Sequence, residues 1–324
     1  MNYEHYFTCL CSQLIHVFST VMTLSLVVYI ISLYKTVSTQ FCDSSTCGDQ
    51  TMLLNNGVRM PVVGLGTAGL TDQDTVTRAV DAAVKHGYRM IDTADLYDNH
   101  HQISMALNTS LTKHGLSRED MFLVTKIRPT DLGHLRCHHA VSRFLEELST
   151  AYLDLVLIHA PVVPPILSMA PTPHRQRQLR IETWRCLEEV QRSGTVRSIG
   201  VSNYDVELLR EVLENGEVVP QVNQVYMTPF YSQDDLKQFA DDHNIQLQAY
   251  SSLGSHSQSR ILKNKMINDI SKKHSVSPAQ VVLKWLVESG WSVIPKSTNP
   301  VHIKQNIDLA FELNKKDLLR IENL

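Results

Sequence analysis

The chain has 324 residues, of which 43% are hydrophobic, so it can bury one large core or two ordinary ones. Charged residues make up 19% of the chain and the formal net charge is -3, with lysines and arginines scattered rather than clustered. This balance creates no basic field that would attract nucleic acid, so we expect no nucleic-acid partner.

The first fifty residues differ in character from the remainder. Residues 15–34 contain no Asp, Glu, Lys or Arg, and this stretch is long enough to cross a bilayer, which takes about 20 apolar residues. The chain opens Met-Asn-Tyr-Glu-His, without the basic start of a secretory signal peptide. Two interpretations stay open: residues 1–50 hold a single membrane-spanning helix, or they are a spurious extension and the functional chain starts near Met52.

The distribution of cations and cysteines bears on the cellular compartment. Lys35 is the first side-chain cation and follows the apolar stretch, which favours a cytoplasmic position for the body of an anchored protein. Four of the six cysteines lie in the first fifty residues, and only Cys137 and Cys186 lie beyond them. A body so poor in cysteine predicts no disulfide scaffold and suits a reducing compartment.

From residue 51 onward, short apolar runs alternate with helical patterns. The Asn56-Gly57 dipeptide predicts a β-hairpin, because it tolerates the positive backbone angles of a tight turn. The segment Thr75–His86 places its apolar residues on one face of a helix, and the same periodicity recurs around Val141. Eight strand-like runs follow the hairpin: Val62–Leu65, Tyr88–Ile91, Phe122–Thr125, Asp154–Ile158, Ser198–Val201, Gln221–Val225, Gln246–Ala249 and Ser292–Ile294.

No linker rich in Gly or Ser divides residues 51–324, so we interpret them as one domain. Eight strand-plus-helix units within this length predict the α/β class and a (β/α)8 barrel, or TIM barrel, preceded by the hairpin. Two long polar loops, Pro161–Pro173 and Ser251–Leu262, follow predicted strands. Such loops hang over the end of a barrel that carries function.

Four polar residues stand at the downstream ends of three successive strand-like runs. Asp92 directly follows its run and Tyr97 comes five residues later, while Lys126 and His159 directly follow the next two runs. Because the C-terminal ends of parallel strands meet at one end of a barrel, we expect these side chains to converge there. Each residue alone has a structural explanation as a packing, capping or solvated group; only the four together indicate chemistry.

These four side chains could protonate a carbonyl group. Tyr97 would be the general acid, and the Lys126 ammonium would ease transfer of its proton by stabilising the phenolate. Asp92 would pair with Lys126 and hold it, and His159 would donate a hydrogen bond that orients the carbonyl oxygen. None of these side chains supplies a hydride, so reduction would need a cofactor.

The surrounding segments resemble signatures of the aldo-keto reductase family, and the resemblance covers nearly all of residues 51–324. They are Ile91-Asp92-Thr93-Ala94-Asp95-Leu96-Tyr97, Leu157-Ile158-His159-Ala160-Pro161, Arg197-Ser198-Ile199-Gly200-Val201-Ser202-Asn203 and Ile294-Pro295-Lys296-Ser297-Thr298. The resemblance implies a (β/α)8 barrel, NADPH bound without a Rossmann domain, and hydride transfer to an aldehyde or ketone. It gives Tyr97, Asp92, Lys126 and His159 the catalytic roles described above.

The resemblance also assigns residues to the cofactor, one by one. They are Gly66 and Thr67 in the first strand-end loop, Asp92, Ser202, Asn203 and Gln224 near the nicotinamide carboxamide, Tyr250 stacked on the nicotinamide ring, Ser251 and Leu253 in the pyrophosphate loop, Lys296, Ser297 and Thr298 in the phosphate-binding turn, His302 and Gln305 just beyond that turn, and Asn306 at the adenine. We predict no metal site.

Two of these positions depart from the family pattern. His302 stands where many NADPH-preferring members carry an arginine, and Gln305 stands where an acidic residue is common. Arginine clamps a phosphate with a permanent charge, whereas a histidine is only partly charged near pH 7. We therefore predict that NADPH is preferred through Lys296 but is held less tightly and in a pH-sensitive way.

The residues and the resemblance together leave two possible functions, an enzyme and a regulatory subunit. The first is a monomeric carbonyl reductase that acts on a small-molecule substrate. The second is a regulatory subunit that binds the cofactor with little or no turnover, as in those family members that sit on ion channels. The intact set of four catalytic residues favours the enzyme.

Overall fold

The computed structural model describes residues 50–165, 171–255 and 258–324. Eight parallel strands form one sheet in the order β10-β9-β8-β7-β6-β5-β4-β3. Val63 forms a parallel bridge with Val293 of β10, which brings the two edges of the sheet together and closes the barrel. The strands are β3 (Leu65–Gly66), β4 (Met90–Asp92), β5 (Phe122–Ile127), β6 (Leu153–Ile158), β7 (Val196–Ser202), β8 (Val222–Tyr226), β9 (Gln246–Tyr250) and β10 (Ser292–Val293).

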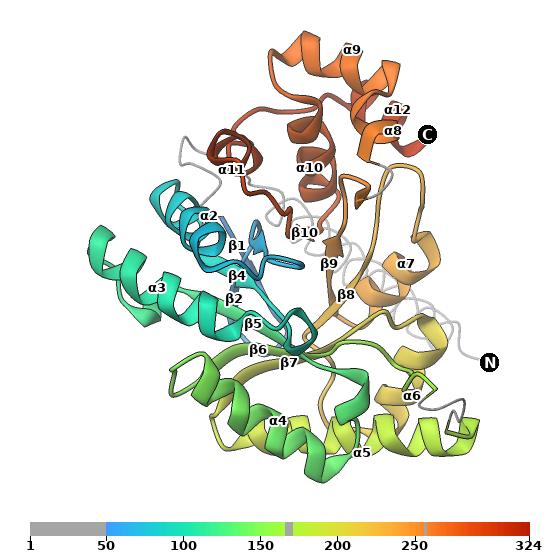
Figure 1. Cartoon of the computed structure of the whole chain (residues 1–324). Helices are drawn as coiled ribbons and strands as arrows, with labels where there is room; N and C mark the ends of the chain where they lie inside the picture. Colours follow the sequence, from blue (N-terminus) through green and yellow to red (C-terminus); the bar gives the residue numbers. More distant parts are fainter. Residues whose placement is uncertain (1–49, 166–170, 256–257) are drawn as a thin grey trace, which may run out of the picture. The chain divides into compact units, whose positions relative to one another are not determined.

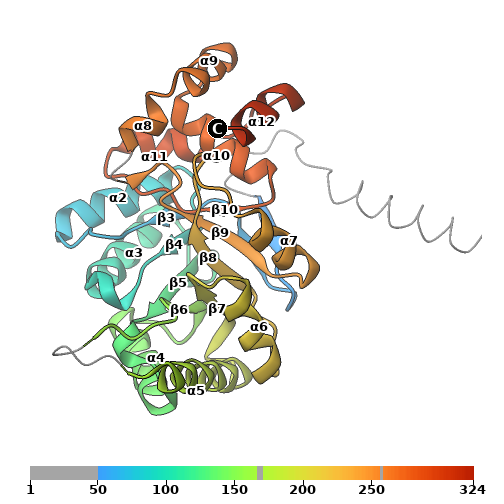
Figure 2. The same ribbon diagram turned by 90° about the vertical axis from the view of Figure 1, so that its right-hand side faces the viewer.

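The helices surround the strands (Figure 1), as the view turned by 90° also shows (Figure 2). The predicted (β/α)8 barrel is therefore confirmed for the described residues, with all eight strands in the expected order. The α-helices are α2 (Gln73–Lys85), α3 (His100–His114), α4 (His134–Glu147), α5 (Pro173–Arg192), α6 (Val206–Asn215), α7 (Asp234–Asp242), α8 (Gln258–Leu262), α9 (Lys265–His274), α10 (Pro278–Glu288), α11 (Pro300–Ile307) and α12 (Lys315–Glu322). Short 3-10 helices are η2 (Asp95–Tyr97), η3 (Arg118–Asp120) and η4 (Pro129–Asp131).

The helix expected over Thr75–His86 is α2, and its limits follow from local chemistry. The Asp72 side chain accepts a hydrogen bond from the Thr75 backbone N–H and so caps the first turn. Val76, Ala79 and Val80 are fully buried on the face that packs into the core. This apolar stripe fixes how the helix lies against the barrel.

The predicted hairpin is also present and closes one end of the barrel. Strands β1 (Thr51–Leu53) and β2 (Arg59–Pro61) pair antiparallel around a turn in which Gly57 has a φ of 84°. The Asn56 amide donates to the Arg197 carbonyl, close to where β7 begins. Met60 packs inside the barrel against inward-facing strand residues such as Met90. The hairpin therefore covers the N-terminal ends of the strands and leaves the C-terminal ends free for a site.

The two cysteines of the barrel are joined by a disulfide that the sequence did not predict. Cys137 of α4 and Cys186 of α5 form a disulfide with their Cα atoms 6.3 Å apart, and both residues are fully buried. The sequence predicted only that the body is no disulfide scaffold, and this one bond was not predicted. A separation of 49 residues in sequence carries no sign of proximity, which arises only because α4 and α5 pack side by side (Figure 1).

The predicted membrane anchor, residues 15–34, lies outside the described residues and stays a prediction, as does the division of the chain at residue 50. Among the residues that the structure does describe, no helix is long and apolar enough to cross a membrane.

Candidate active site

The four residues singled out in the sequence meet at the C-terminal end of the barrel. Asp92 is the last residue of β4, and the short helix η2 that follows ends at Tyr97. Lys126 is the penultimate residue of β5, because the strand ends two residues later than expected. His159 directly follows β6. Three neighbouring strands thus supply the acid and the groups around it.

Lys126 is fully buried and lies at the centre of this group. Its Nζ donates to Asp92 Oδ1 at 2.7 Å and to the Thr93 carbonyl at 2.9 Å, and it lies 3.3 Å from the Tyr97 hydroxyl. Burial of the ammonium opposes its charge, but attraction by Asp92 and Tyr97 outweighs that cost and raises the pKa of Lys126. The lysine therefore stays charged throughout the physiological range.

Tyr97 is not made more acidic by its protein surroundings. Burial raises the pKa of its phenol, the Lys126 ammonium offsets part of that effect, and the Asp92 carboxylate adds to it. The Lys126 ammonium acts in the expected direction, since it favours the phenolate, but burial has the larger effect on the pKa of Tyr97. Desolvation wins because the hydroxyl lies in a largely buried site.

His159 is held neutral beside the acid. Burial, reinforced by repulsion from Lys126, lowers the pKa of its imidazole to about 4. The ring lies edge-on to Tyr97 with the centroids 5.6 Å apart, and its Nδ1 is buried without a hydrogen-bond partner among the described residues. A neutral imidazole can offer one N–H donor to an oxygen in the pocket.

A row of amides supports Asp92 from inside the barrel. Gln224 donates to Asp92 Oδ2 at 2.8 Å and to the Gln248 amide oxygen at 2.6 Å. Gln248 donates in turn to the Ser292 hydroxyl at 3.1 Å. The sequence analysis missed Gln248 and Ser292. The only indication of their role in the sequence is that each is a polar residue in a buried strand, where a polar group needs a hydrogen-bond partner.

A second group of polar residues lies where β7 and β9 end. Tyr250 donates to the Asn203 side-chain oxygen at 2.7 Å, and the Asn203 amide donates to the His159 carbonyl at 2.9 Å. Ser202 donates to the Gln224 carbonyl at 2.8 Å. Asn203 and Ser251 have φ angles of 63° and 53°, a region that non-glycine residues occupy rarely and that often marks a functional site.

These residues line a cavity of about 540 Å³. Of the predicted site residues, its walls include Gly66, Asp92, Tyr97, His159, Ser202, Asn203, Gln224, Tyr250, Ser251, Leu253 and Lys296. Ala68, Ser252, Ser255, Ile294 and Pro295 also line it and were not predicted. The volume falls within the range of ligand pockets, about 300–1,000 Å³.

Gly66 and Lys296 define the rim where strands β3 and β10 end. A Cβ atom at Gly66 would lie 2.6 Å from the Ile294 carbonyl oxygen, so only glycine fits between the two segments. The Lys296 ammonium reaches across to the Ala68 carbonyl at 2.9 Å. Thr67, which was predicted beside Gly66, is fully buried, and its hydroxyl donates to the Asp92 carbonyl.

The remaining predicted residues are not part of the cavity wall. Ser297, Thr298, His302, Gln305 and Asn306 follow Lys296 along the loop after β10 and into α11. His302 and Thr298 are exposed, whereas Asn306 is 3% exposed. Asn299 caps α11 through a hydrogen bond from the Val301 backbone N–H. The Ile303 backbone N–H donates to the Asn299 carbonyl, so Asn299 satisfies two of the first N–H groups of the helix.

Fold and site together define an α/β barrel with a cavity at the C-terminal ends of its strands, lined by Asp92, Tyr97 and His159. The sequence model of the aldo/keto reductase family matches residues 62–324. Glyoxal reductase from Bacillus subtilis is 37% identical over 275 residues, which span 85% of this chain and 92% of that protein.

Solved structures of aldo-keto reductases are also similar to this chain. The aldo/keto reductase from Brucella melitensis is 36% identical with a TM-score of 0.76, covering 85% of this chain and 98% of that one. The aldo-keto reductase from Bombyx mori in complex with NADP is 28% identical with a TM-score of 0.78, covering 85% and 92%. This chain belongs to the aldo/keto reductase family, a family of oxidoreductases.

Proposed function

We propose that this protein reduces aldehydes and ketones to alcohols, with NADPH as the hydride donor and Tyr97 as the general acid. The observation that supports this most directly is the set of contacts at Lys126, whose ammonium touches both Asp92 and the Tyr97 hydroxyl. Tyr97, which follows β4, and His159, which follows β6, both line the cavity, so a carbonyl oxygen can reach both.

The residues around the cavity fit an extended nucleotide cofactor. Gly66 has no side chain, so the cofactor can approach its backbone closely. The Asn203 and Gln224 amides line the same cavity as Tyr97. Tyr250 offers an aromatic face for the nicotinamide ring. Lys296, Ser297 and Thr298 would hold phosphate oxygens just before the start of α11, where the helix dipole favours negative charge. When bound, NADPH supplies the hydride for the carbonyl carbon.

The chain's own residues then handle the proton. As the carbonyl oxygen gains negative charge it becomes far more basic than a phenolate, so even a tyrosine with a raised pKa can protonate it. Lys126 stabilises the phenolate that Tyr97 leaves behind, and neutral His159 can hydrogen-bond the same oxygen. Tyr97 regains its proton from solvent. NADPH, one proton and a carbonyl thus give NADP and an alcohol.

The substrates we propose are small aldehydes and ketones. Glyoxal reductase, among the relatives, acts on a small dicarbonyl compound as its name says, and the cavity of about 540 Å³ leaves limited space beside a bound cofactor. Glyoxal and 4-nitrobenzaldehyde are therefore suitable first substrates.

The test follows NADPH oxidation with these two substrates in the wild type and in Tyr97→Phe. We expect turnover in the wild type and a loss of at least about 100-fold in the variant, because the general acid is removed. Tyr152→Phe is the matched control: Tyr152 directly precedes β6 at the opposite end of the barrel and should leave turnover unchanged.

Cofactor binding separates the enzyme from the regulatory subunit. Quenching of protein fluorescence by NADPH should be retained in Tyr97→Phe, since the variant keeps the cofactor residues. Tight NADPH binding by a wild type that turns over no carbonyl compound would contradict the proposal and favour a cofactor-binding regulatory subunit.

A further inference from the structure

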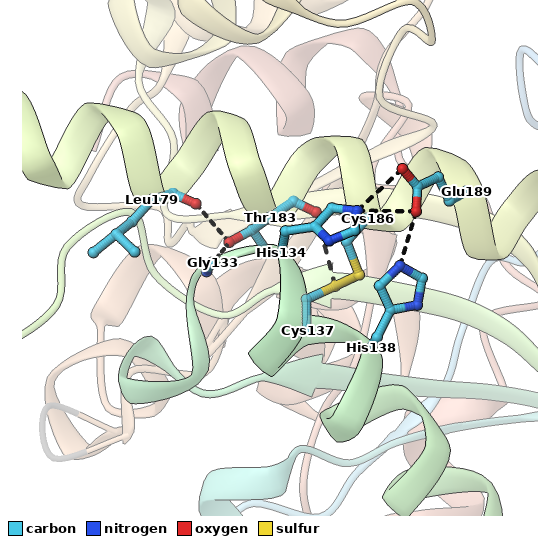
Figure 3. The surroundings of a disulfide bond; sticks show 8 residues. All are labelled: Gly133, His134, Cys137, His138, Leu179, Thr183, Cys186 and Glu189. Atoms are coloured by element: carbon cyan, nitrogen blue, oxygen red, sulfur yellow. Dashed lines mark hydrogen bonds and ion pairs between the residues drawn. A yellow bond between two sulfur atoms is a disulfide. The ribbon is translucent and has the colours of Figure 1, made fainter.

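A cluster of histidine and carboxylate side chains lies on the outer surface where α4 packs against α5. His134 and His138 are one helical turn apart on α4, so both project from the same face. Glu189 of α5 faces them (Figure 3). None of these three residues lines the catalytic cavity. The cluster is therefore a separate feature of the barrel.

The three side chains converge on one point. The Nε2 atoms of His134 and His138 lie 3.0 Å and 2.9 Å from the same oxygen of Glu189, and all three potential ligand atoms lie within 4.8 Å of one another. Two ligands of a tetrahedral zinc ion are about 3.4 Å apart, given metal–ligand distances of about 2.1 Å. Small rotations of the side chains would therefore admit an ion between them.

The charges around these three side chains favour the binding of a cation. Among the described residues, no lysine or arginine pairs with Glu189, whose carboxylate accepts hydrogen bonds only from the two imidazoles. The side chains of His134, His138 and Glu189 are 41%, 36% and 44% exposed. An ion could thus enter from solvent and keep a water as its fourth ligand.

The two helices that carry the ligands are fixed to each other at this place. The Cys137–Cys186 disulfide joins them directly beside the cluster, with Cys137 between the two histidines on α4 (Figure 3). One turn earlier, the Thr183 hydroxyl accepts a buried hydrogen bond from the Gly133 backbone N–H. A site whose supporting helices cannot separate loses less entropy when it binds an ion.

We propose that His134, His138 and Glu189 form a binding site for a divalent transition-metal ion of the zinc class, preorganised by the Cys137–Cys186 disulfide. Two imidazoles and one carboxylate are a ligand set that zinc accepts, whereas Mg²⁺ and Ca²⁺ prefer oxygen ligands alone. On binding, each neutral imidazole moves its proton from Nε2 to Nδ1, which frees the Nε2 lone pair for the metal.

Isothermal titration of ZnCl2 into the full chain, without a histidine tag, tests the proposal. The segment before residue 51 carries four further cysteines, which could also bind zinc. The proposed site is therefore identified as the zinc site that is weakened in specific variants. His138→Ala and Glu189→Gln should each weaken one zinc site by at least about tenfold, the effect of even outer-sphere changes at metal sites. MgCl2 should produce no such binding.

His139→Ala is the matched control, because His139 lies next to His138 but is exposed and has no role in the cluster. It should keep the site, and carbonyl turnover should be unchanged in all three variants, which shows that they fold. Equal zinc binding in the wild type, His138→Ala, Glu189→Gln and His139→Ala would overturn the proposal, as would no zinc binding at all.

The role of the disulfide has its own measurement. The double variant Cys137→Ala/Cys186→Ala keeps all three ligands but releases the covalent link between α4 and α5. Its zinc affinity should fall about tenfold if the link holds the ligands in place. An affinity equal to that of the wild type would overturn the preorganisation by the disulfide.

Discussion

At the scale of single residues, the proposed catalytic centre contains a buried ion pair. Lys126 is fully buried and Asp92 is 2% exposed, and each charge is compensated mainly by the other. Removing one partner of such a pair leaves the other charge buried without compensation. This lowers the free energy of unfolding by far more than the intact pair contributes. The pair thus couples catalysis to stability.

This coupling gives a prediction for Lys126→Met. The variant should lose turnover and about 3 to 5 kcal/mol of its free energy of unfolding, measured by urea denaturation at pH 7. Adding Asp92→Asn should restore most of the stability, because no charge is then left unpaired, but it should not restore turnover. A double variant as unstable as the single one would contradict this account.

His159 makes stability depend on pH. Burial lowers the pKa of this imidazole to about 4, below its value of about 6.5 in an unfolded chain. The unfolded state therefore binds more protons between these values, so the contribution of His159 is complete above pH 6.5 and is lost as the pH falls toward 4.

The matched variant is His159→Gln, which keeps a polar side chain without the titration. Between pH 7 and pH 5 the wild type should lose about 1 to 2 kcal/mol more of its unfolding free energy than the variant. Urea midpoints at the two pH values provide the measurement. Identical losses in both proteins would show that His159 is not held neutral by the fold.

At the scale of elements, the sequence predicted most of the strands and helices of the barrel. The alternation of apolar runs and helical patterns predicted eight strands and the hairpin, because buried strands and amphipathic helices must show their period locally. Strand ends were less certain: β5 runs two residues beyond Thr125, since pairing with β6 extends it. Asp92, Tyr97, Lys126 and His159 were found because strand ends meet at one end of any parallel barrel.

Features that depend on long-range contact were not predictable from this one sequence. Gln248 supports Gln224 only because β8 and β9 are neighbours. The Cys137–Cys186 disulfide and the pairing of Glu189 with His138 both arise from the packing of α4 on α5. No local period or spacing in the chain records which helix faces which.

The loop from β10 to α11 gives a prediction about the cofactor. His302 lies in the first turn of α11, just beyond Lys296, Ser297 and Thr298, where a permanent charge would clamp the extra phosphate of NADPH. Since a histidine loses its charge as the pH rises from 6 to 8, NADPH should bind more weakly at pH 8 in the wild type. His302→Arg should bind about tenfold more tightly at pH 8, with a flatter pH profile.

NADH is the control, because it lacks that phosphate. Its affinity should show neither the pH dependence nor the gain in His302→Arg. Fluorescence titrations with both nucleotides in both proteins complete the comparison. A flat NADPH profile in the wild type, with no gain in the variant, would exclude a role for His302 at the phosphate.

At the scale of the whole molecule, the two ends of the barrel divide stability from function. The hairpin covers the N-terminal ends of the strands and packs Met60 into the interior, while the cavity opens at the C-terminal ends. The outer layer is reinforced separately, where the Cys137–Cys186 disulfide joins α4 to α5. Loss of this link should therefore change stability without touching the reacting groups.

A link that closes a loop of 49 residues restricts the unfolded chain and should contribute about 4 kcal/mol to the free energy of unfolding. Reductant should lower the urea midpoint of the wild type accordingly, while carbonyl turnover at low urea stays the same. Cys137→Ala/Cys186→Ala should show the lower midpoint from the start and no further response to reductant, which also controls for the four cysteines before residue 51. If reductant shifts both proteins equally, the stabilising bond is not between α4 and α5.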